Sequence, residues 1–171
     1  WFGLGKPTGV DIASEVVGRV PTLAWKQRVQ NEAWTTGDTY NVAIGQGNLE
    51  VTPLQLAVAS AAIANKGTLM RPQIARAIID ENAKVIREIE PEILSTVPAD
   101  PNYYTIVHEG MRRSVVEDVN VAARDDCSGL QIAGKTGTAE FGPNIKLPGA
   151  AGQPEKYTRQ SHSWFVGFAP Y

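Results

Sequence analysis

The 171-residue sequence is poor in the residues that build disulfides and metal centres. Its one cysteine, Cys127, allows neither an internal disulfide nor a cysteine metal cluster. A small buried thiol is the simpler interpretation; a reactive thiol is the alternative, because Arg124 could stabilise a thiolate although the two following aspartates would oppose it. With only His108 and His162 and no HExxH-type pair, we expect no metal site.

Neither sign of charge dominates, and no hydrophobic run is long. The 16 Lys and Arg and 18 Asp and Glu give a net charge of −2 without a basic run, which argues against a nucleic-acid binder. The longest apolar stretch, residues 54–64, is too short and too rich in alanine to span a bilayer. The sequence begins at Trp1 in glycine-rich sequence without a signal peptide, so we expect a piece of a longer polypeptide.

The clearest local signal in the sequence is the start of a helix. Thr52 suits the N-cap, Pro53 suits the first helical position, and Gln55 can complete a capping box. The helix is expected to run through alanine-rich sequence to about Lys66, with Gly67 as its left-handed stop. We interpret it as a buried central helix.

Strand and helix signals alternate along the rest of the chain. Their order predicts an α/β or α+β fold in which sequential strands pair antiparallel. The predicted elements are loops over residues 1–22, a short helix or surface segment over 25–34, turns at Gly37, Gly45 and Gly47, a hairpin of 73–79 with 84–89, a helix from Asp100, and strands over 131–140 and 161–169.

The helix from Asp100 carries an apolar face. Its apolar residues recur at spacings of three and four, namely Tyr104, Val107, Met111 and Val115. His108 lies beside that face, where we expect a structural histidine with satisfied hydrogen bonds rather than a ligand.

Residues 141–160 contain three glycines and three prolines and show no periodicity. Such a stretch within a compact domain predicts a functional or mobile loop. Lys146, Lys156 and Arg159 could contact a glycan, although a solvated loop is the simpler interpretation.

Residues 133–140, AGKTGTAE, concentrate the candidate chemistry and admit two interpretations. Residues 129–136, GLQIAGKT, match the phosphate-binding pattern GxxxxGK[ST]. That loop needs a hydrophobic strand before it and a helix that starts near Lys135. Polar residues before Gly129 and glycines after Thr136 oppose both, so nucleotide binding is the weaker alternative.

The second interpretation places the Lys-Thr-Gly triplet on an edge strand beside an acyl-transfer site. On a strand, Lys135 and Gly137 face one side and Thr136 and Thr138 the other. The edge can pair with a peptide substrate, which a glycine lets approach the backbone. Lys135 supplies positive charge, a threonine hydroxyl can hold a carboxylate, and an N–H near Thr138 can serve an oxyanion hole. An ordinary strand with an accidental triplet is the competing interpretation.

Further stretches accompany the triplet, and together they resemble the transpeptidase domain of class B penicillin-binding proteins, most of all the elongation-type penicillin-binding protein 2 group. The stretches occur in the family's order and cover nearly the whole chain. They are FGLGKPTGVD (2–11), NVAIGQG (41–47), TPLQLA (52–57), AIANKGTLMRP (62–72), AGKTGTAE (133–140) and SWFVGFAP (163–170).

The resemblance implies the fold shared by penicillin-binding transpeptidases and serine β-lactamases, an antiparallel sheet with packed helices. It implies a serine-type D,D-transpeptidase of the cell wall that binds peptidoglycan stem peptides and β-lactams and uses no cofactor. Lys135 would act electrostatically, Thr136, Gly137 and Thr138 would bind substrate, and the Thr138 N–H would be one oxyanion donor. A β-lactam sensor of the same fold is the alternative.

The family's mechanism uses three motifs, and this sequence has one. No serine stands three residues before a lysine or two before an asparagine, so the Ser-x-x-Lys and Ser-x-Asn motifs are absent. We therefore expect residues 1–171 to be the C-terminal portion of a transpeptidase domain, truncated at both ends and inactive alone. Missing sheet neighbours predict marginal stability or self-association.

The resemblance also implies partners and a location. The partners would be the missing N-terminal part of the same domain and a membrane glycosyltransferase of the elongation machinery. A single N-terminal anchor, absent from this chain, would hold the domain on the periplasmic or extracellular side of the bacterial cytoplasmic membrane.

Overall fold

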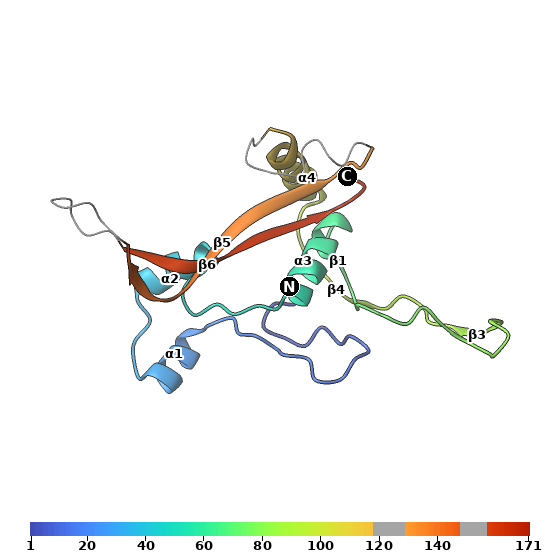
Figure 1. Ribbon diagram of the computed structural model, residues 1–171, viewed down its shortest axis with the longest axis horizontal. Coiled ribbons are helices and arrows are strands. Elements are labelled where there is room, and N and C mark those ends of the chain that lie inside the picture. Colours follow the sequence, from blue (N-terminus) through green and yellow to red (C-terminus); the bar gives the residue numbers. More distant parts are fainter. Residues whose placement is uncertain (118–128, 148–156) are drawn as a thin grey trace.

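The computed structural model describes residues 1–117, 129–147 and 157–171 (Figure 1). Cys127, whose role the sequence left open, lies outside them. In the described part, helices alternate with three two-stranded antiparallel sheets, which confirms the mixed α/β class. The elements are α1 (Leu23–Gln30), α2 (Thr36–Ala43), α3 (Pro53–Ala64), β1 (Thr68–Met70), β2 (Ala77–Ile79), β3 (Val85–Glu88), β4 (Ile93–Thr96), α4 (Pro101–Val116), β5 (Ala133–Lys146) and β6 (Tyr157–Phe168).

The hydrophobic core lies where α3 packs against β1 and the N-terminal segment. The side chains in this cluster are Phe2, Leu54, Val58, Ala62 and Leu69. Only one face of α3 is covered, because Ala57 and Ala61 are exposed. The predicted central helix is therefore buried along one face and open along the other.

The ends of α3 follow local chemistry. The predicted capping box is confirmed: Thr52 Oγ1 accepts from the Gln55 N–H, and the Gln55 side chain accepts from the Thr52 N–H. The helix ends at Ala64, two residues earlier than predicted. Lys66 takes the left-handed conformation at φ 53°, and Gly67 donates to the Ala62 carbonyl at 2.7 Å, which is the Schellman pattern. Lys66 rather than Gly67 is thus the first left-handed residue after the helix.

Helix α2 corrects the prediction of turns near residue 37. Thr35 and Asp38 form a complete capping box, and this cap outweighs the cost of Gly37 inside the first turn. Helix α1 resolves residues 25–30 of the ambiguous segment 25–34 as a short helix, and residues 31–34 follow it without regular structure. The buried Lys26 ammonium lies 2.6 Å from the Asp38 carboxylate and joins α1 to α2.

Strands β5 and β6 form a long antiparallel ribbon that crosses the molecule (Figure 1). The ribbon corrects the prediction of a loop over 141–160, because β5 continues to Lys146 and β6 begins at Tyr157. A register shift between Phe141 and Ile145 accommodates Gly142 and Pro143 within the pairing. Lys156, one of the three cations placed in that loop, lies outside the described residues.

Helices α3 and α4 hold one end of the ribbon, where α3 contacts β6 and α4 contacts β5. The Arg112 guanidinium donates to the Ile132 carbonyl at 2.8 Å. His108 lies 2.7 Å from the Ile63 carbonyl oxygen through Nε2, and its ring contacts Phe168 with centroids 5.0 Å apart. The predicted structural role of His108 is confirmed. Val107, predicted on the apolar face, is 42% exposed.

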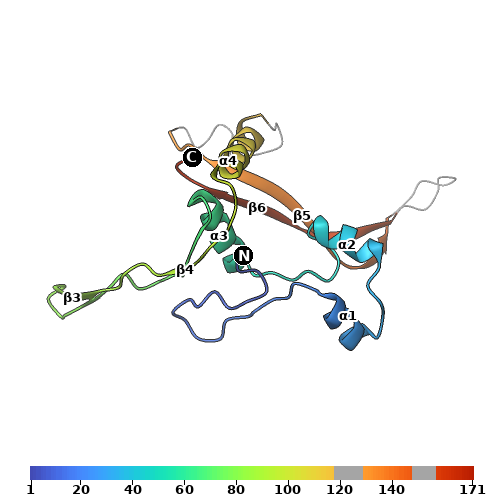
Figure 2. The same cartoon turned by 180° about the vertical axis from the view of Figure 1, so that it is seen from behind.

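The two smaller sheets lie at the opposite side of α3 from the ribbon. Strands β2 and β3 form the predicted hairpin, although each is shorter than expected, and this hairpin projects away from the body (Figures 1 and 2). Strands β1 and β4 pair antiparallel and were not predicted, because three or four residues give too short a pattern.

Candidate functional site

Strand β5 contains all four predicted site residues. Lys135, Thr136, Gly137 and Thr138 lie near its start and are exposed. They pair in register with β6, and Gly137 is opposite Trp164. The strand prediction for this motif is confirmed. The phosphate-binding alternative fails, because these residues form a strand where that loop requires a helix N-terminus.

The edge of β5 that does not pair with β6, here called the open edge, carries a contact from the turn after α2. Gln46 donates from Nε2 to the Thr138 carbonyl oxygen at 3.0 Å and accepts at Oε1 from the Glu140 N–H at 3.3 Å. Both backbone groups therefore point away from β6. Because the N–H and C=O of one strand residue point to the same edge, the Thr138 N–H also points away from β6.

A cavity of about 600 Å³ lies beside the open edge. Its walls come from the start of β5, the facing part of β6, the segment 44–51 after α2, and two leucines of the core side, Leu4 and Leu56. This volume falls within the range of small-molecule sites. The polar groups of β5 meet an otherwise largely apolar lining there, an arrangement that can orient an extended ligand.

The glycine of the triplet is not required by the fold. A Cβ at Gly137 would lie 3.7 Å from the Trp164 Cβ, an ordinary packing distance, and the backbone there is not left-handed. By contrast, a Cβ at Gly134 would clash with the Phe165 ring and lie 3.0 Å from the Val166 carbonyl oxygen. Gly134 is thus needed for packing. Gly137 leaves the β5 backbone beside the cavity without a side chain over it.

Lys135 supplies the cavity with positive charge. Its ammonium donates to the Thr136 carbonyl oxygen at 2.7 Å and lies 3.5 Å from Thr136 Oγ1. Among the described residues no carboxylate lies within ion-pair distance of this ammonium. Its charge therefore remains available to an anionic ligand group.

Aromatic side chains form the part of the wall contributed by the ribbon. Trp164 and His162 line the cavity from β6, and Phe141 lines it from β5. The rings of Phe141 and His162 stack with centroids 4.3 Å apart and planes 15° apart. The sequence motifs did not predict this wall, because alternation on two strands identifies a face but not what the face contacts.

Gln46 was missed as well. Its flanking glycines, Gly45 and Gly47, indicated only turns, and no local signal links residue 46 to residues 138 and 140. The contact depends on how the turn after α2 lies against β5 in the folded chain, so the Gly-Gln-Gly tripeptide at residues 45–47 is the one local feature that marks the position.

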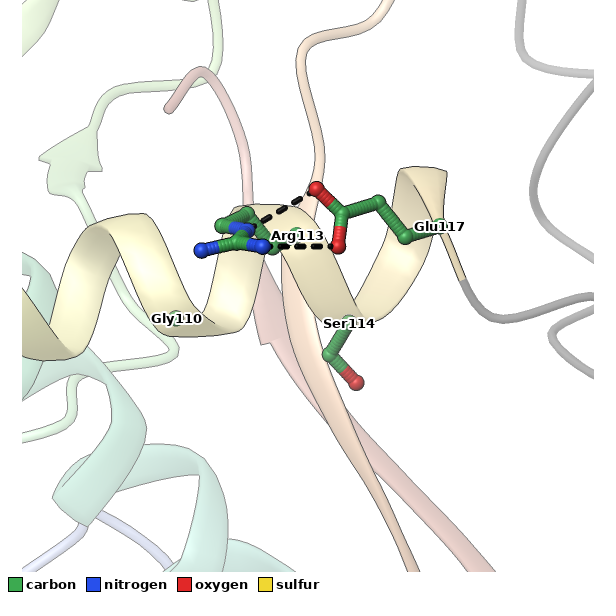
Figure 3. Close-up of a pocket in the computed structure, with 4 residues that line it drawn as sticks. All are labelled: Gly110, Arg113, Ser114 and Glu117. Atoms are coloured by element: carbon green, nitrogen blue, oxygen red, sulfur yellow. Dashed lines mark hydrogen bonds and ion pairs between the residues drawn. The ribbon is translucent and has the colours of Figure 1, made fainter.

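A second hollow lies along the outer side of α4 and is lined by Gly110, Arg113, Ser114 and Glu117 (Figure 3). Arg113 and Glu117 form a two-point ion pair with bonds of 2.8 and 3.2 Å. This pairing raises the pKa of Arg113 and lowers the pKa of Glu117. Because the two charges neutralise each other, the hollow offers little to a charged ligand.

The described lining of the β5 cavity contains two threonines but no serine and no cysteine. Within the described ranges there is no group of three or more His, Cys, Asp or Glu residues that could hold a metal ion. No helix in those ranges has the length and apolar character needed to cross a membrane. The site thus has binding groups and positive charge without a strong nucleophile of its own.

Comparison with known proteins finds a match over the whole chain. The family described as "Penicillin binding protein transpeptidase domain" matches residues 1–171. Peptidoglycan D,D-transpeptidase MrdA of Acinetobacter baumannii is 35% identical over 170 residues, which cover 99% of this chain and 25% of that protein. The MrdA protein of Escherichia coli K12 is 31% identical over 172 residues, covering 99% and 27%.

Solved structures of penicillin-binding proteins are also similar to this chain. The chain superimposes on Pseudomonas aeruginosa PBP2, crystallised in complex with WCK 5153, with a TM-score of 0.72 and 31% identity over 99% of this chain and 34% of that one. It also resembles PBP2 in the Helicobacter pylori complex with MreC, with a TM-score of 0.64 and 28% identity over 99% and 28%. The chain spans about a quarter of the length of the curated relatives it matches.

Proposed function

The chain belongs to the penicillin-binding protein transpeptidase family, and from that premise we propose that it forms the substrate-binding edge of a peptidoglycan D,D-transpeptidase of the MrdA type. The observation that carries the proposal is the open edge of β5. It places three groups beside one cavity: Lys135, the backbone at Gly137 without a side chain, and the Thr138 N–H, which points away from β6.

Each residue of the triplet has a role in this proposal. The Lys135 ammonium attracts the carboxylate end of a D-Ala-D-Ala peptide, and the Thr136 and Thr138 hydroxyls donate hydrogen bonds to that carboxylate. Gly137 lets the peptide lie close to β5. The Thr138 N–H stabilises the oxyanion that forms when a nucleophile attacks the scissile carbonyl.

The nucleophile comes from outside residues 1–171 in this proposal, since no Ser-x-x-Lys motif occurs among them. A serine hydroxyl attacks the penultimate D-alanine carbonyl, and terminal D-alanine leaves. The acyl group then passes from the serine ester to an amine of a neighbouring stem peptide. Residues 1–171 alone would bind the peptide weakly and would not turn it over.

Two related structures support a proposal about partners. A related PBP2 was solved in a complex with MreC, and another related structure belongs to a peptidoglycan synthase complex that coordinates polymerization and crosslinking. We infer that the longer protein acts beside a peptidoglycan polymerase, on the outer side of the cytoplasmic membrane.

Labelling with a fluorescent penicillin tests the proposal in the longer protein that carries these residues. We expect a covalent adduct, labelled about a hundredfold more slowly by Lys135→Ala because a charge at the reacting group is lost. Lys84→Ala, in the turn between β2 and β3, is the control and should label normally. Release of D-alanine from a D-Ala-D-Ala pentapeptide separates a transpeptidase from a sensor that is only acylated. If the wild-type protein forms no adduct, both the transpeptidase and the sensor interpretations are refuted.

A further inference from the structure

Gln46 pairs with the open edge of β5 as a neighbouring strand would. Its amide donates to one backbone carbonyl and accepts from the N–H two residues further on, at Thr138 and Glu140. We propose that Gln46 is a positioning residue of the site: it fixes the open edge of β5 so that the Thr138 N–H stays aligned toward the cavity. This inference rests on the proposed function and deepens it.

The two bonds hold the backbone on the side of Thr138 that β6 does not support. In the described part of the chain, no second strand covers the open edge, so Gln46 replaces a missing strand at this point. An oxyanion donor contributes most when its position is set before the reaction, because moving it during the reaction costs free energy. A side chain bonded to the carbonyl of Thr138 itself restrains that residue directly.

The turn after α2 aims Gln46 at β5. Gly45 and Gly47 take left-handed conformations, at φ 76° and 74°, which fold the chain back on both sides of Gln46. The Gln46 N–H donates to the Asn41 carbonyl at 2.8 Å. A Cβ at Gly47 would lie only 3.1 Å from the Asn41 Cβ, so the turn is tight as well as bonded.

The amide group of Gln46 matters in addition to the length of its side chain. A glutamine presents a donor and an acceptor at the same time, as a peptide group does, and both are used here. A glutamate of the same size loses the donor when ionised and places a negative charge against the Thr138 carbonyl oxygen. A protonated glutamate regains the donor. The ionisable residues that line the neighbouring cavity are Glu50, Lys135, Glu140 and His162.

The test compares Gln46→Glu and Gln46→Met with wild type in the longer protein, by the kinetics of acylation with benzylpenicillin. We expect Gln46→Met to lower the acylation rate constant at least about tenfold and to change the dissociation constant of the initial complex less than about twofold. For Gln46→Glu, the ratio of its rate constant to that of wild type should rise as the pH falls from 8 to 5. Gln27→Glu, on exposed α1, is the matched control and should show a flat ratio.

Amide hydrogen exchange at Glu140 reports on the hydrogen bond between its N–H and Gln46, and it does not require acylation. Its N–H should exchange faster in Gln46→Met than in wild type, whereas the Gln27→Glu control should not change. Unaltered exchange, or a flat pH ratio for Gln46→Glu together with wild-type acylation, would overturn the inference. If the wild-type protein is not acylated at all, the proposed function fails instead, and the exchange result still decides whether Gln46 holds the edge.

Discussion

At the scale of single residues, the two glycines that flank the Lys-Thr pair have opposite reasons to be glycine. Gly134 is buried, and a side chain there would collide with Phe165. Gly137 is exposed, and a methyl group there would meet Trp164 at 3.7 Å, which folding tolerates. The structure thus shows that packing requires a glycine at residue 134 but not at residue 137.

This difference predicts opposite outcomes for two alanine substitutions. Gly134→Ala should destabilise the protein by about 1–3 kcal/mol, because it overpacks a close strand contact. Gly137→Ala should change stability by less than about 0.5 kcal/mol, the usual range for a surface position, and should still slow acylation by benzylpenicillin. Thermal unfolding and acylation kinetics measure the two effects. Equal loss of stability in both variants would contradict the account.

The sequence predicted the strand that carries the candidate residues better than it predicted the surroundings of that strand. A short motif with a defined spacing identified Lys135, Gly137 and Thr138 on a strand, because their chemistry is local. Gln46 and Trp164 become part of the site only through contacts between distant segments, and no periodicity encodes such contacts.

At the scale of elements, strong local signals were reliable and weak ones were not. The α3 cap and the hairpin of β2 and β3 were predicted because capping boxes and turn residues act over a few positions. Helix α2 was missed since Gly37 argued against it, and the ends of β5 and β6 were missed since pairing between strands overrode the glycines and prolines. Tertiary contacts decide such cases.

Helix α2 supports the turn that carries Gln46, and a partly buried ion pair between Lys26 and Asp38 holds the helix in place. The Lys26 ammonium, together with bonds from Thr35, lowers the pKa of Asp38 to about 2, from an ordinary value of 3.8. Because the folded-state pKa is the lower one, the ionised carboxylate stabilises the fold above about pH 4, and this contribution is lost as the pH falls toward 2.

Asp38→Asn should therefore be less stable than wild type at pH 5 and should lose less stability on acidification. The difference between the two unfolding midpoints should shrink as the pH falls from 4 to 2. Unfolding followed by circular dichroism measures it, with Glu81→Gln in the hairpin turn as the control. A difference that is the same at pH 5 and pH 2 would show that the ion pair does not act as described.

The cap of α3 ties the N-terminal segment to the core. The fully buried Gln55 amide donates to the Lys6 and Val17 carbonyls at 2.8 and 2.6 Å and also accepts from the Thr52 N–H. Gln55→Leu keeps the size of the side chain but leaves three backbone groups without their partner.

We expect Gln55→Leu to cost about 2–4 kcal/mol, because unpaired buried polar groups are expensive. Thr52→Ala, which removes the hydroxyl of the cap together with the adjacent methyl group, should cost about 1 kcal/mol. Urea unfolding of both variants tests the order of the two effects. A Thr52→Ala variant less stable than Gln55→Leu would contradict it.

At the scale of the whole molecule, the described chain exposes much apolar surface. Three separate two-stranded sheets leave strand edges unpaired, and large side chains such as Ile86, Ile93 and Phe165 are 46–66% exposed. Isolated two-stranded sheets are marginally stable in water. This surface is what a larger transpeptidase domain would cover.

Residues 1–171 expressed alone should therefore self-associate or unfold with low cooperativity. Sedimentation velocity over a tenfold range of concentration, combined with urea unfolding, measures both properties. A stable monomer with a single cooperative transition would show that these residues need no further segment to fold.

The central claim is that this chain supplies the binding edge of a transpeptidase while the nucleophile lies elsewhere. Intact mass spectrometry after incubation with benzylpenicillin tests it most directly, on residues 1–171 and on the longer protein that carries them. The account predicts no adduct on residues 1–171 and one penicilloyl adduct on the longer protein, on a serine outside this chain. An adduct on any residue of the 171 would contradict it.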